Sequence, residues 1–181
     1  DYLRRREGGI IWHTQGSGKS LTMVWLAKWI RENMTDSRVL IITDRTELDQ
    51  QIKDVFMGVN EELYRTKSGV DLVSNLNAAK PWLLCSLIHK FGTKEDDDTD
   101  EEGAKEFIEA MKKALPPDFR VKGNLFVFVD ECHRTQSGKL HEAMKAILSD
   151  AVFIGFTGTP LLKSDKAKSV ETFGRYIHTY K

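Results

Sequence analysis

The stretch His13–Ser20, HTQGSGKS, has the form of a phosphate-binding loop, whose usual pattern is G-x-x-x-x-G-K-[S/T]. Its two glycines let the backbone curl so that successive N–H groups point inward at phosphate oxygens. Lys19 can reach the β- and γ-phosphates of a nucleoside triphosphate, and Ser20 can hold Mg²⁺. The residues expected to contact the nucleotide are Thr14, Gln15, Gly16, Ser17, Gly18, Lys19, Ser20 and Leu21.

His13 stands at the position where the pattern has its first glycine. That position lies at the exit of a strand and requires a reversal of the chain, with no phosphate contact of its own, so a histidine is compatible with the motif. Apolar residues precede the loop and a helical pattern follows it, which is the context that the motif requires. A Gly-rich turn between a strand and a helix, without nucleotide, is the simpler alternative.

Short apolar runs alternate with helical patterns along the chain, which predicts an α/β domain with a parallel sheet. Strands are expected at Gly9–His13, Arg38–Thr43, Pro81–Ser86, Asn124–Glu131 and Ala151–Thr157. Helices are expected at Gly18–Asn33, from about Thr46, around Leu72–Ala79, at Ala104–Leu115 and at Lys139–Leu148. The first helix has apolar residues on most sides, including Leu21 and Trp25, which predicts that it is buried. Without an internal repeat or a second core, residues 1–181 are expected to form one domain.

The run Val127–His133, VFVDECH, places two acids directly after the most continuous apolar strand of the sequence. A buried strand that ends in Asp130 and Glu131 is typical of a Walker B element. Asp130 is expected to bind Mg²⁺ together with Ser20, and Glu131 to orient or deprotonate the attacking water. Lys19, Asp130 and Glu131 are therefore the predicted catalytic residues. In a parallel sheet the acids and the phosphate loop share the carboxyl edge, where ligands bind. Two acids that merely end a strand are the alternative.

Composition and charge exclude several classes of protein. The chain has 181 residues, is 40% hydrophobic and carries no net charge, which argues against a disordered chain and against a strongly basic nucleic-acid binder. The run Lys94–Glu102, KEDDDTDEE, holds seven acids and one base, so the remainder carries +6 and any basic face is local. Residues 93–102 are expected to form a mobile acidic loop. Cys85 and Cys132 form no metal-binding pattern, which fits the reducing environment of the cytoplasm. No apolar run reaches the length that a membrane span needs.

The run Gly155–Pro160, GFTGTP, follows the last predicted strand at the same edge, although T-G-T-P is also an ordinary turn. Together the three runs resemble motifs I, II and III of superfamily 2 helicases and translocases, the second in a D-E-C-H form. The sequence around them resembles the motor region of the restriction (R) subunit of type I restriction-modification enzymes. The matching runs are GGIIWHTQGSGKSLTM (8–23), LIITDRTELDQQI (40–52), LLCSLIHKFG (83–92), VDECHRTQSG (129–138), FIGFTGTPL (153–161) and FGRYIHTY (173–180).

This resemblance implies a RecA-like P-loop domain, with a mostly parallel central sheet and helices on both faces. It implies ATP and Mg²⁺ as cofactors, and duplex DNA as the polymer that the motor pumps before a separate nuclease domain cleaves it. Methyltransferase and specificity subunits are the implied partners, in the cytoplasm of a prokaryote. The nuclease domain and the second motor domain, which supplies arginine fingers, are expected outside this chain, so the chain alone is expected to be nearly inactive.

The resemblance also assigns roles to individual residues. The residues that match the coupling between the nucleotide site and motif III are His133, Thr157, Gly158 and Thr159. Thr43, Asp44 and Arg45 match motif Ia, which in relatives lies by the nucleic-acid backbone. Arg134, which follows motif II, is a further candidate for contact with DNA. As alternatives, His133 could be a satisfied polar residue at the start of a loop, and Arg45 and Arg134 could be solvated surface charges.

Three other functions are compatible with these motifs. The chain could belong to another superfamily 2 enzyme, such as an RNA helicase or a remodeller, which the response of the ATPase to duplex DNA or RNA would reveal. It could be a P-loop ATPase that never tracks nucleic acid, whose activity would not depend on salt through a phosphate backbone. It could also be a non-catalytic assembly module with a vestigial loop, which would not bind ATP analogues.

Overall fold

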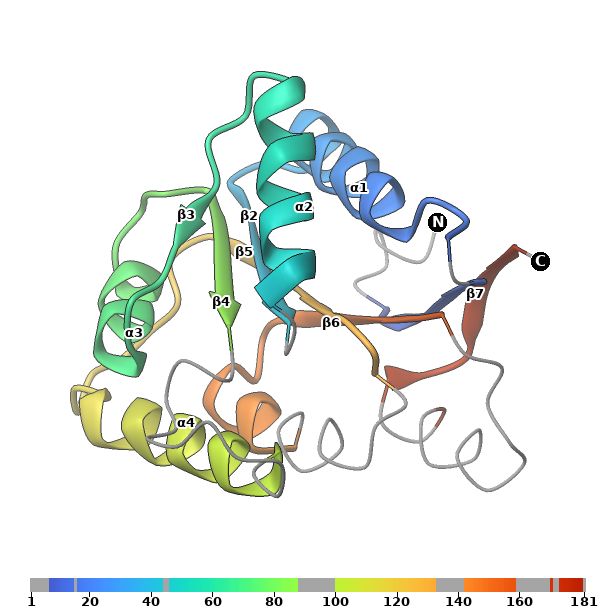
Figure 1. Cartoon of the computed structure of the whole chain (residues 1–181). Helices are drawn as coiled ribbons and strands as arrows, with labels where there is room; N and C mark the ends of the chain where they lie inside the picture. Colours follow the sequence, from blue (N-terminus) through green and yellow to red (C-terminus); the bar gives the residue numbers. More distant parts are fainter. Residues whose placement is uncertain are drawn as a thin grey trace.

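Seven strands form one sheet in which every pairing is parallel (Figure 1). The computed structural model describes residues 7–14, 16–43, 46–87, 100–132, 142–158, 170 and 173–180. The strands are β1 (Gly9–His13), β2 (Ser37–Thr43), β3 (Tyr64–Arg65), β4 (Leu83–Leu87), β5 (Asn124–Val129), β6 (Val152–Thr157) and β7 (Tyr176–Tyr180). Their order across the sheet is β3-β4-β2-β5-β6-β1-β7, so the predicted parallel α/β class is confirmed.

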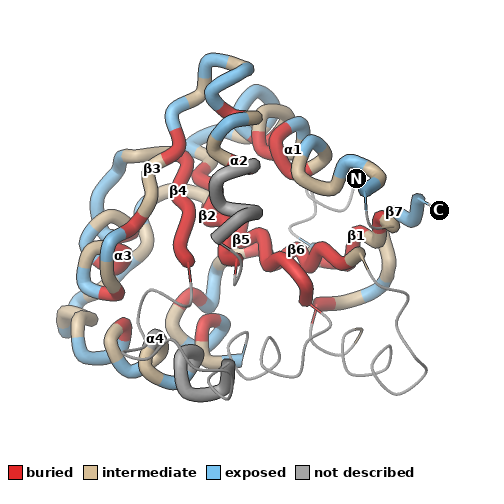
Figure 2. Tube along the Cα trace, in the orientation of Figure 1, coloured by how far each residue is buried: buried red, intermediate tan, exposed pale blue. Residues whose placement is uncertain are grey.

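Helices cover both faces of this sheet. They are α1 (Lys19–Asn33), α2 (Thr46–Gly58), α3 (Gly69–Asn77) and α4 (Asp100–Ala114), and residues 142–147 are also helical. One hydrophobic cluster joins Met23 of α1 and Phe56 of α2 to the sheet, and a second joins Leu72 of α3 and Met111 of α4 to it. Consecutive residues of β2 alternate between the two clusters, which therefore lie on opposite faces. Figure 2 shows the central strands buried between these layers.

The two strands that the sequence does not predict lie at the two edges of the sheet. β3 has only two residues, too few for a recognisable pattern, and β7 mixes polar residues with partly exposed aromatic ones. The other five strands agree with the prediction to within two residues at each end. The largest differences include the end of β5, which stops at Val129 because the chain turns at residues 130–132.

Two predictions about helices are wrong in part. α1 is buried only where Met23, Val24, Ala27 and Ile30 face the sheet. Leu21 and Trp25 are 39% and 62% exposed, because a helix that lies on a sheet can bury only one side. α4 begins at Asp100, inside the predicted acidic loop, where acids favour a helix N-terminus. Residues 88–99 and 139–141 lie outside the described residues. Among the described helices, none is both long and apolar enough to cross a membrane.

Arg38, at the start of β2, is a buried cation that ties three segments together, with only 2% of the residue exposed. Its guanidinium donates hydrogen bonds of 2.7–3.2 Å to the backbone carbonyls of Asn75, Leu76, Ala78, Pro81 and Lys122. These carbonyls belong to the C-terminal end of α3 and to the segments that precede β4 and β5. Arg38 therefore fastens the amino edge of the sheet, opposite the edge that carries the predicted site.

Replacing Arg38 by Met would remove six hydrogen bonds to these carbonyls, although the carbonyls of Asn75 and Leu76 would still accept from backbone N–H groups. We expect the free energy of unfolding to fall by about 3 kcal/mol or more, because hydrogen bonds to a charged group are worth roughly 1.5–3 kcal/mol each and water replaces only some of them. Urea unfolding followed by circular dichroism measures the change. The exposed Arg120→Met is the matched control, with an expected change below about 0.5 kcal/mol. A loss below about 1 kcal/mol in Arg38→Met would contradict this role.

Candidate functional site

The loop between β1 and α1 has the backbone conformation that a phosphate cradle needs. Gly16 and Gly18 have φ values of 82° and 86°, in a region that glycine enters without steric cost. A Cβ atom built on either glycine would meet nothing within 4 Å, so the space beside both is open. In the described part of the chain, no side chain caps the N-terminus of α1 by a hydrogen bond. The helix therefore presents its positive end to an anion.

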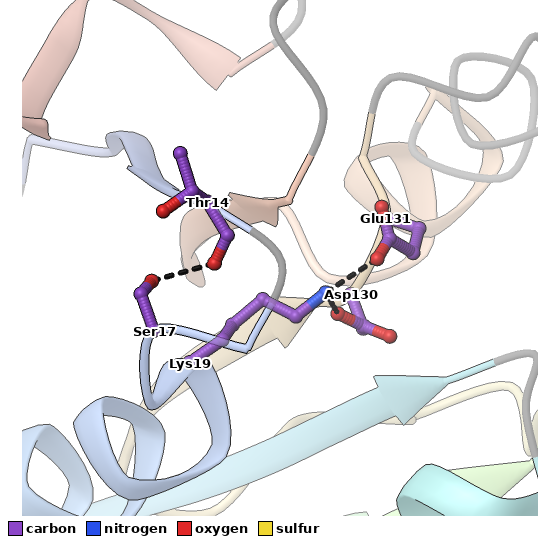
Figure 3. A network of polar contacts seen from close by, with 5 residues as sticks. All are labelled: Thr14, Ser17, Lys19, Asp130 and Glu131. Carbon is purple, nitrogen blue, oxygen red and sulfur yellow. Dashed lines mark hydrogen bonds and ion pairs between the residues drawn. The ribbon is translucent and has the colours of Figure 1, made fainter. Parts of the chain in front are cut away.

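Hydrogen bonds hold this loop in place (Figure 3). Ser17 donates two of them to the carbonyl of Thr14, from its Oγ at 2.6 Å and from its backbone N–H at 3.0 Å. The N–H of Thr14 donates to the carbonyl of Tyr180, at the end of β7, over 3.2 Å. The loop is thus closed on itself and anchored to the edge strand.

His13 fills the space between the loop and β7. The residue is buried, and its ring centroid lies 5.3 Å from that of His178 and 5.6 Å from that of Tyr180. Burial, together with the neighbouring His178, lowers the pKa of His13 below its ordinary value. A neutral histidine therefore stands where the usual pattern has glycine, and it packs against the strand that also anchors Thr14.

The ammonium group of Lys19 meets both predicted catalytic acids (Figure 3). Its Nζ lies 2.8 Å from Asp130 Oδ1 and 2.5 Å from Glu131 Oε1, although Lys19 and Glu131 are 112 residues apart in the chain. The side chains of Lys19, Asp130 and Glu131 are 16%, 0% and 8% exposed, so water screens these charges little. The predicted convergence of the phosphate loop and the acidic pair is therefore observed in the structure.

Burial alone would lower the pKa of Lys19, but the neighbouring carboxylates, Asp130 foremost, outweigh that effect and raise it. Lys19 therefore carries its charge at physiological pH. The same two carboxylates, after the larger effect of burial, raise the pKa of the Cys132 thiol to about 12. Cys132 is accordingly an uncharged, buried thiol beside the ion pair.

The acidic turn after β5 is held between two strands. The N–H of Asp130 donates to the carbonyl of Ile42 on β2 over 2.9 Å, and the N–H of Cys132 donates to the carbonyl of Phe156 on β6 over 3.0 Å. Glu131 lies between these two bonds and has φ 48°, which is uncommon for a residue with a side chain. The backbone therefore fixes the direction in which the Glu131 side chain leaves the turn.

Some of the other predicted site residues are described by the structure, and the rest lie outside its described part. Ser20 and Leu21 lie in the first turn of α1, and Gly158 directly follows β6. Thr43 and Thr157 end β2 and β6 and are fully buried, which in this conformation argues against a direct contact of Thr43 with DNA. The residues that lie outside the described part of the chain are Gln15, Asp44, Arg45, His133, Arg134 and Thr159, so their roles stay predictions.

Three residues that shape the site were not predicted from the sequence: Gly155, His178 and Tyr180. Tyr176, His178 and Tyr180 recur at every second position, which is the period of one face of a strand. This alternation was a usable signal for β7, but it does not indicate which strand lies next to it. Gly155 interrupts an otherwise bulky apolar strand, and such a glycine often marks a close approach of neighbouring atoms.

ATP and Mg²⁺ fit the residues present. Open space beside Gly16 and Gly18 and the uncapped start of α1 suit phosphate groups, and Lys19 supplies a cation beside them. Ser20 and Asp130 offer hard oxygen ligands, the type that Mg²⁺ prefers, at the same edge of the sheet. The arrangement is suited to the phosphate groups of a nucleotide.

The parallel sheet, the phosphate loop after β1 and the acidic turn after β5 together define a RecA-like P-loop domain. The family model described as SWI2/SNF2 ATPase matches residues 2–181, and the chain belongs to that family.

Curated relatives narrow the similarity further. The chain is 30% identical over 181 residues to the type I restriction enzyme SauCOLORF180P endonuclease subunit of Staphylococcus aureus (strain COL), covering 95% of this chain and 17% of that subunit. It is 30% identical over 194 residues to the type I restriction enzyme HindI endonuclease subunit of Haemophilus influenzae, covering 97% and 17%. The predicted resemblance to R subunits is confirmed, and the chain spans about 17% of the length of these two relatives.

Solved structures share the fold. The UvsW helicase from bacteriophage T4 superposes with a TM-score of 0.62 at 18% identity, over 96% of this chain and 54% of that one. A nuclease-deletion mutant of the Type ISP restriction-modification enzyme LlaGI, in complex with a DNA substrate mimic, gives 0.56 at 14% identity, over 99% and 18%. The RecA-like architecture predicted from the motifs is thus confirmed.

The lowered pKa of His13 makes stability depend on pH. Below the ordinary histidine pKa of about 6.5, the unfolded chain takes up a proton at His13 that the folded chain resists, so acid favours unfolding. We expect the stability lost between about pH 7.5 and pH 5.5 to be smaller in His13→Gln, which cannot titrate, than in the unmodified chain. Urea unfolding at both pH values measures it. An equal or larger loss in the variant would contradict the buried, neutral state of His13.

Proposed function

We propose that this chain is the first motor domain of a type I restriction endonuclease R subunit. The subunit would use ATP hydrolysis to translocate duplex DNA before a separate nuclease domain cleaves it. The observation that carries the proposal is the convergence of Lys19 with Asp130 and Glu131 at the carboxyl edge of the sheet. Membership of the SWI2/SNF2 ATPase family and the similarity to type I endonuclease subunits support an ATP-driven motor.

In this proposal the phosphates of ATP lie against the loop of Gly16 and Gly18. Lys19, whose ammonium group forms ion pairs with two carboxylates, would also interact with the negatively charged β- and γ-phosphates. The ion pair between Glu131 and Lys19 would then weaken, and the Glu131 carboxylate could accept a proton from the attacking water. When bound, Mg²⁺ would add positive charge at the same phosphates, with Ser20 and Asp130 as its protein ligands.

Coupling of hydrolysis to movement is assigned to His133 and to the motif III residues Thr157, Gly158 and Thr159. The position of β6 supports this assignment, because β6 is the strand between the one that precedes the phosphate loop and the one that precedes the acidic turn. A shift of β6 would therefore move both the phosphate loop and the acidic turn. The buried hydroxyl of Thr157 at its carboxyl end is suited to such a link.

Contacts with DNA are assigned to Asp44 and Arg45, which follow β2 in the sequence, and to Arg134, which follows the acidic turn in the sequence. Charged contacts with the phosphate backbone give affinity without reading sequence. Sequence recognition is therefore assigned to partners, namely the methyltransferase and specificity subunits of a restriction-modification complex. The second motor domain of the same subunit would complete the ATP site with arginine fingers, which contribute about 10³–10⁵ in rate where they act.

The experiment that tests this function compares the full-length subunit with its Lys19→Ala variant, assembled with the methyltransferase and specificity subunits. We expect the variant to lose translocation and DNA-length-dependent ATP use by at least about 100-fold, because the cation at the β- and γ-phosphates is gone. Displacement of a triplex-forming strand from duplex DNA measures translocation.

The exposed Lys145→Ala is the matched control and should translocate at the rate of the unmodified subunit. Unchanged circular dichroism and thermal unfolding of Lys19→Ala would show that its fold is intact. Retained translocation in Lys19→Ala would refute the role of the phosphate loop. An ATPase that RNA stimulates and duplex DNA does not would instead favour an RNA helicase.

A further inference from the structure

A cysteine and a glycine from different motifs contact each other next to the acidic turn. Cys132 directly follows Glu131 and is 3% exposed, and Gly155 lies on β6. A Cβ atom at position 155 would lie 2.7 Å from Sγ and 2.9 Å from Cβ of Cys132, closer than such atoms can approach. The Cys132 side chain therefore occupies the space that any side chain at position 155 would need.

The same turn contains a residue in an uncommon conformation. Glu131, with φ 48°, is in the left-handed region, which is sterically unfavourable for a residue with a side chain. Such a conformation persists only where the surroundings enforce it. On one side the enforcing contact is the bond from the N–H of Asp130 to Ile42, and on the other it is the bond from the N–H of Cys132 to Phe156.

The side of the turn next to β6 is held by side chains as well as by backbone. Cys132 lies in the same hydrophobic cluster as Phe153 and Phe173, and the space beside Gly155 is also limited by Phe173, whose Cδ1 would lie 3.2 Å from a Cβ there. The thiol and the ring of Phe173 therefore both border the space next to Gly155. Because protein interiors are closely packed and have little free space, a side chain added at Gly155 would displace the turn.

We propose that Cys132 is a positioning residue, whose thiol rests on Gly155 and thereby sets where the Glu131 carboxylate lies relative to Lys19. Cys132 itself touches no reacting atom, since its effect passes through the backbone of the turn. The role of Glu131 in hydrolysis rests on the proposed function, whereas the contact between Cys132 and Gly155 does not. In this arrangement the cysteine of the D-E-C-H motif, Cys132, and the first glycine of GFTGTP, Gly155, pack directly against each other.

The catalytic test uses the DNA-dependent ATPase of the full-length subunit. In Gly155→Ala, we expect kcat to fall at least about 10-fold while KM for ATP changes less than about 3-fold, because the phosphate loop is untouched and Glu131 is displaced. Adding Cys132→Gly removes both close atoms, Sγ and Cβ, and should restore at least about 3-fold of the lost kcat. No restoration, or an unchanged kcat in Gly155→Ala, would overturn the proposal.

Two further glycines provide matched controls. Gly69 is nearly as crowded as Gly155, since a Cβ there would lie 2.9 Å from the Cβ of Ala110. It is the first residue of α3, where that helix packs on α4, away from the turn. Gly69→Ala should therefore lower the melting temperature and leave kcat unchanged well below that temperature. Gly58→Ala, where a Cβ would meet nothing within 4 Å, should change neither. A loss of kcat in Gly69→Ala equal to that in Gly155→Ala would reduce the effect to general destabilisation and overturn the proposal.

Thermal unfolding of the 181-residue chain tests the contact without any activity. In a cycle of Gly155→Ala, Cys132→Gly and the double variant, we expect the fall in melting temperature of the double variant to be smaller than the sum of the two single falls. Additive losses would overturn the contact. If the losses are non-additive but the full-length subunit has no ATPase, the contact stands and the proposed function is wrong.

Discussion

Every strand pairing in the described sheet is parallel, and the candidate site depends on that constraint. Parallel strands end at the same edge, so the loop that follows β1 and the turn that follows β5 meet there although they are far apart in the chain. The phosphate loop and the acidic turn are separated by a single strand, β6. This is what brings the ammonium group of Lys19 between the carboxylates of Asp130 and Glu131. Arg38 fastens the opposite edge, where its hydrogen bonds hold the segments that lead into β4 and β5.

Much of this arrangement was predictable because its signals are local. A continuous apolar strand followed by two acids, and glycines placed to curl a loop ahead of a helix, each specify their own structure, and the parallel rule then brings them to one edge. The exposure of Trp25 on α1 was not predictable in the same way, since an apolar helix surface does not reveal which of its sides will meet the sheet. Nor does the alternation of aromatic residues in β7 reveal that β7 pairs with β1 and contacts His13.

The site departs from the usual phosphate-loop pattern at position 13 and keeps a required glycine at position 155. At position 13 the usual glycine is replaced by a histidine, which the structure accommodates because the ring is directed at His178 and Tyr180 of β7. At position 155 a glycine is required, because the thiol of Cys132 occupies the space next to it. Both contacts tie a functional segment to a neighbouring strand. The phosphate loop depends on β7, and the acidic turn depends on β6, so the geometry around Lys19 is set by residues outside the motif that contains it.

The proposed motor requires that the loop around Lys19 hold the phosphates of ATP. Calorimetric titration of the 181-residue chain with ATP and Mg²⁺, beside its Lys19→Ala variant, tests that claim most directly. We expect weak, saturable binding that falls at least about 10-fold in the variant. Hydrolysis should stay barely above background even with duplex DNA, because arginine fingers that supply about 10³–10⁵ in rate are expected from another domain. Equal binding by both chains, or robust DNA-stimulated turnover by this chain alone, would contradict the account.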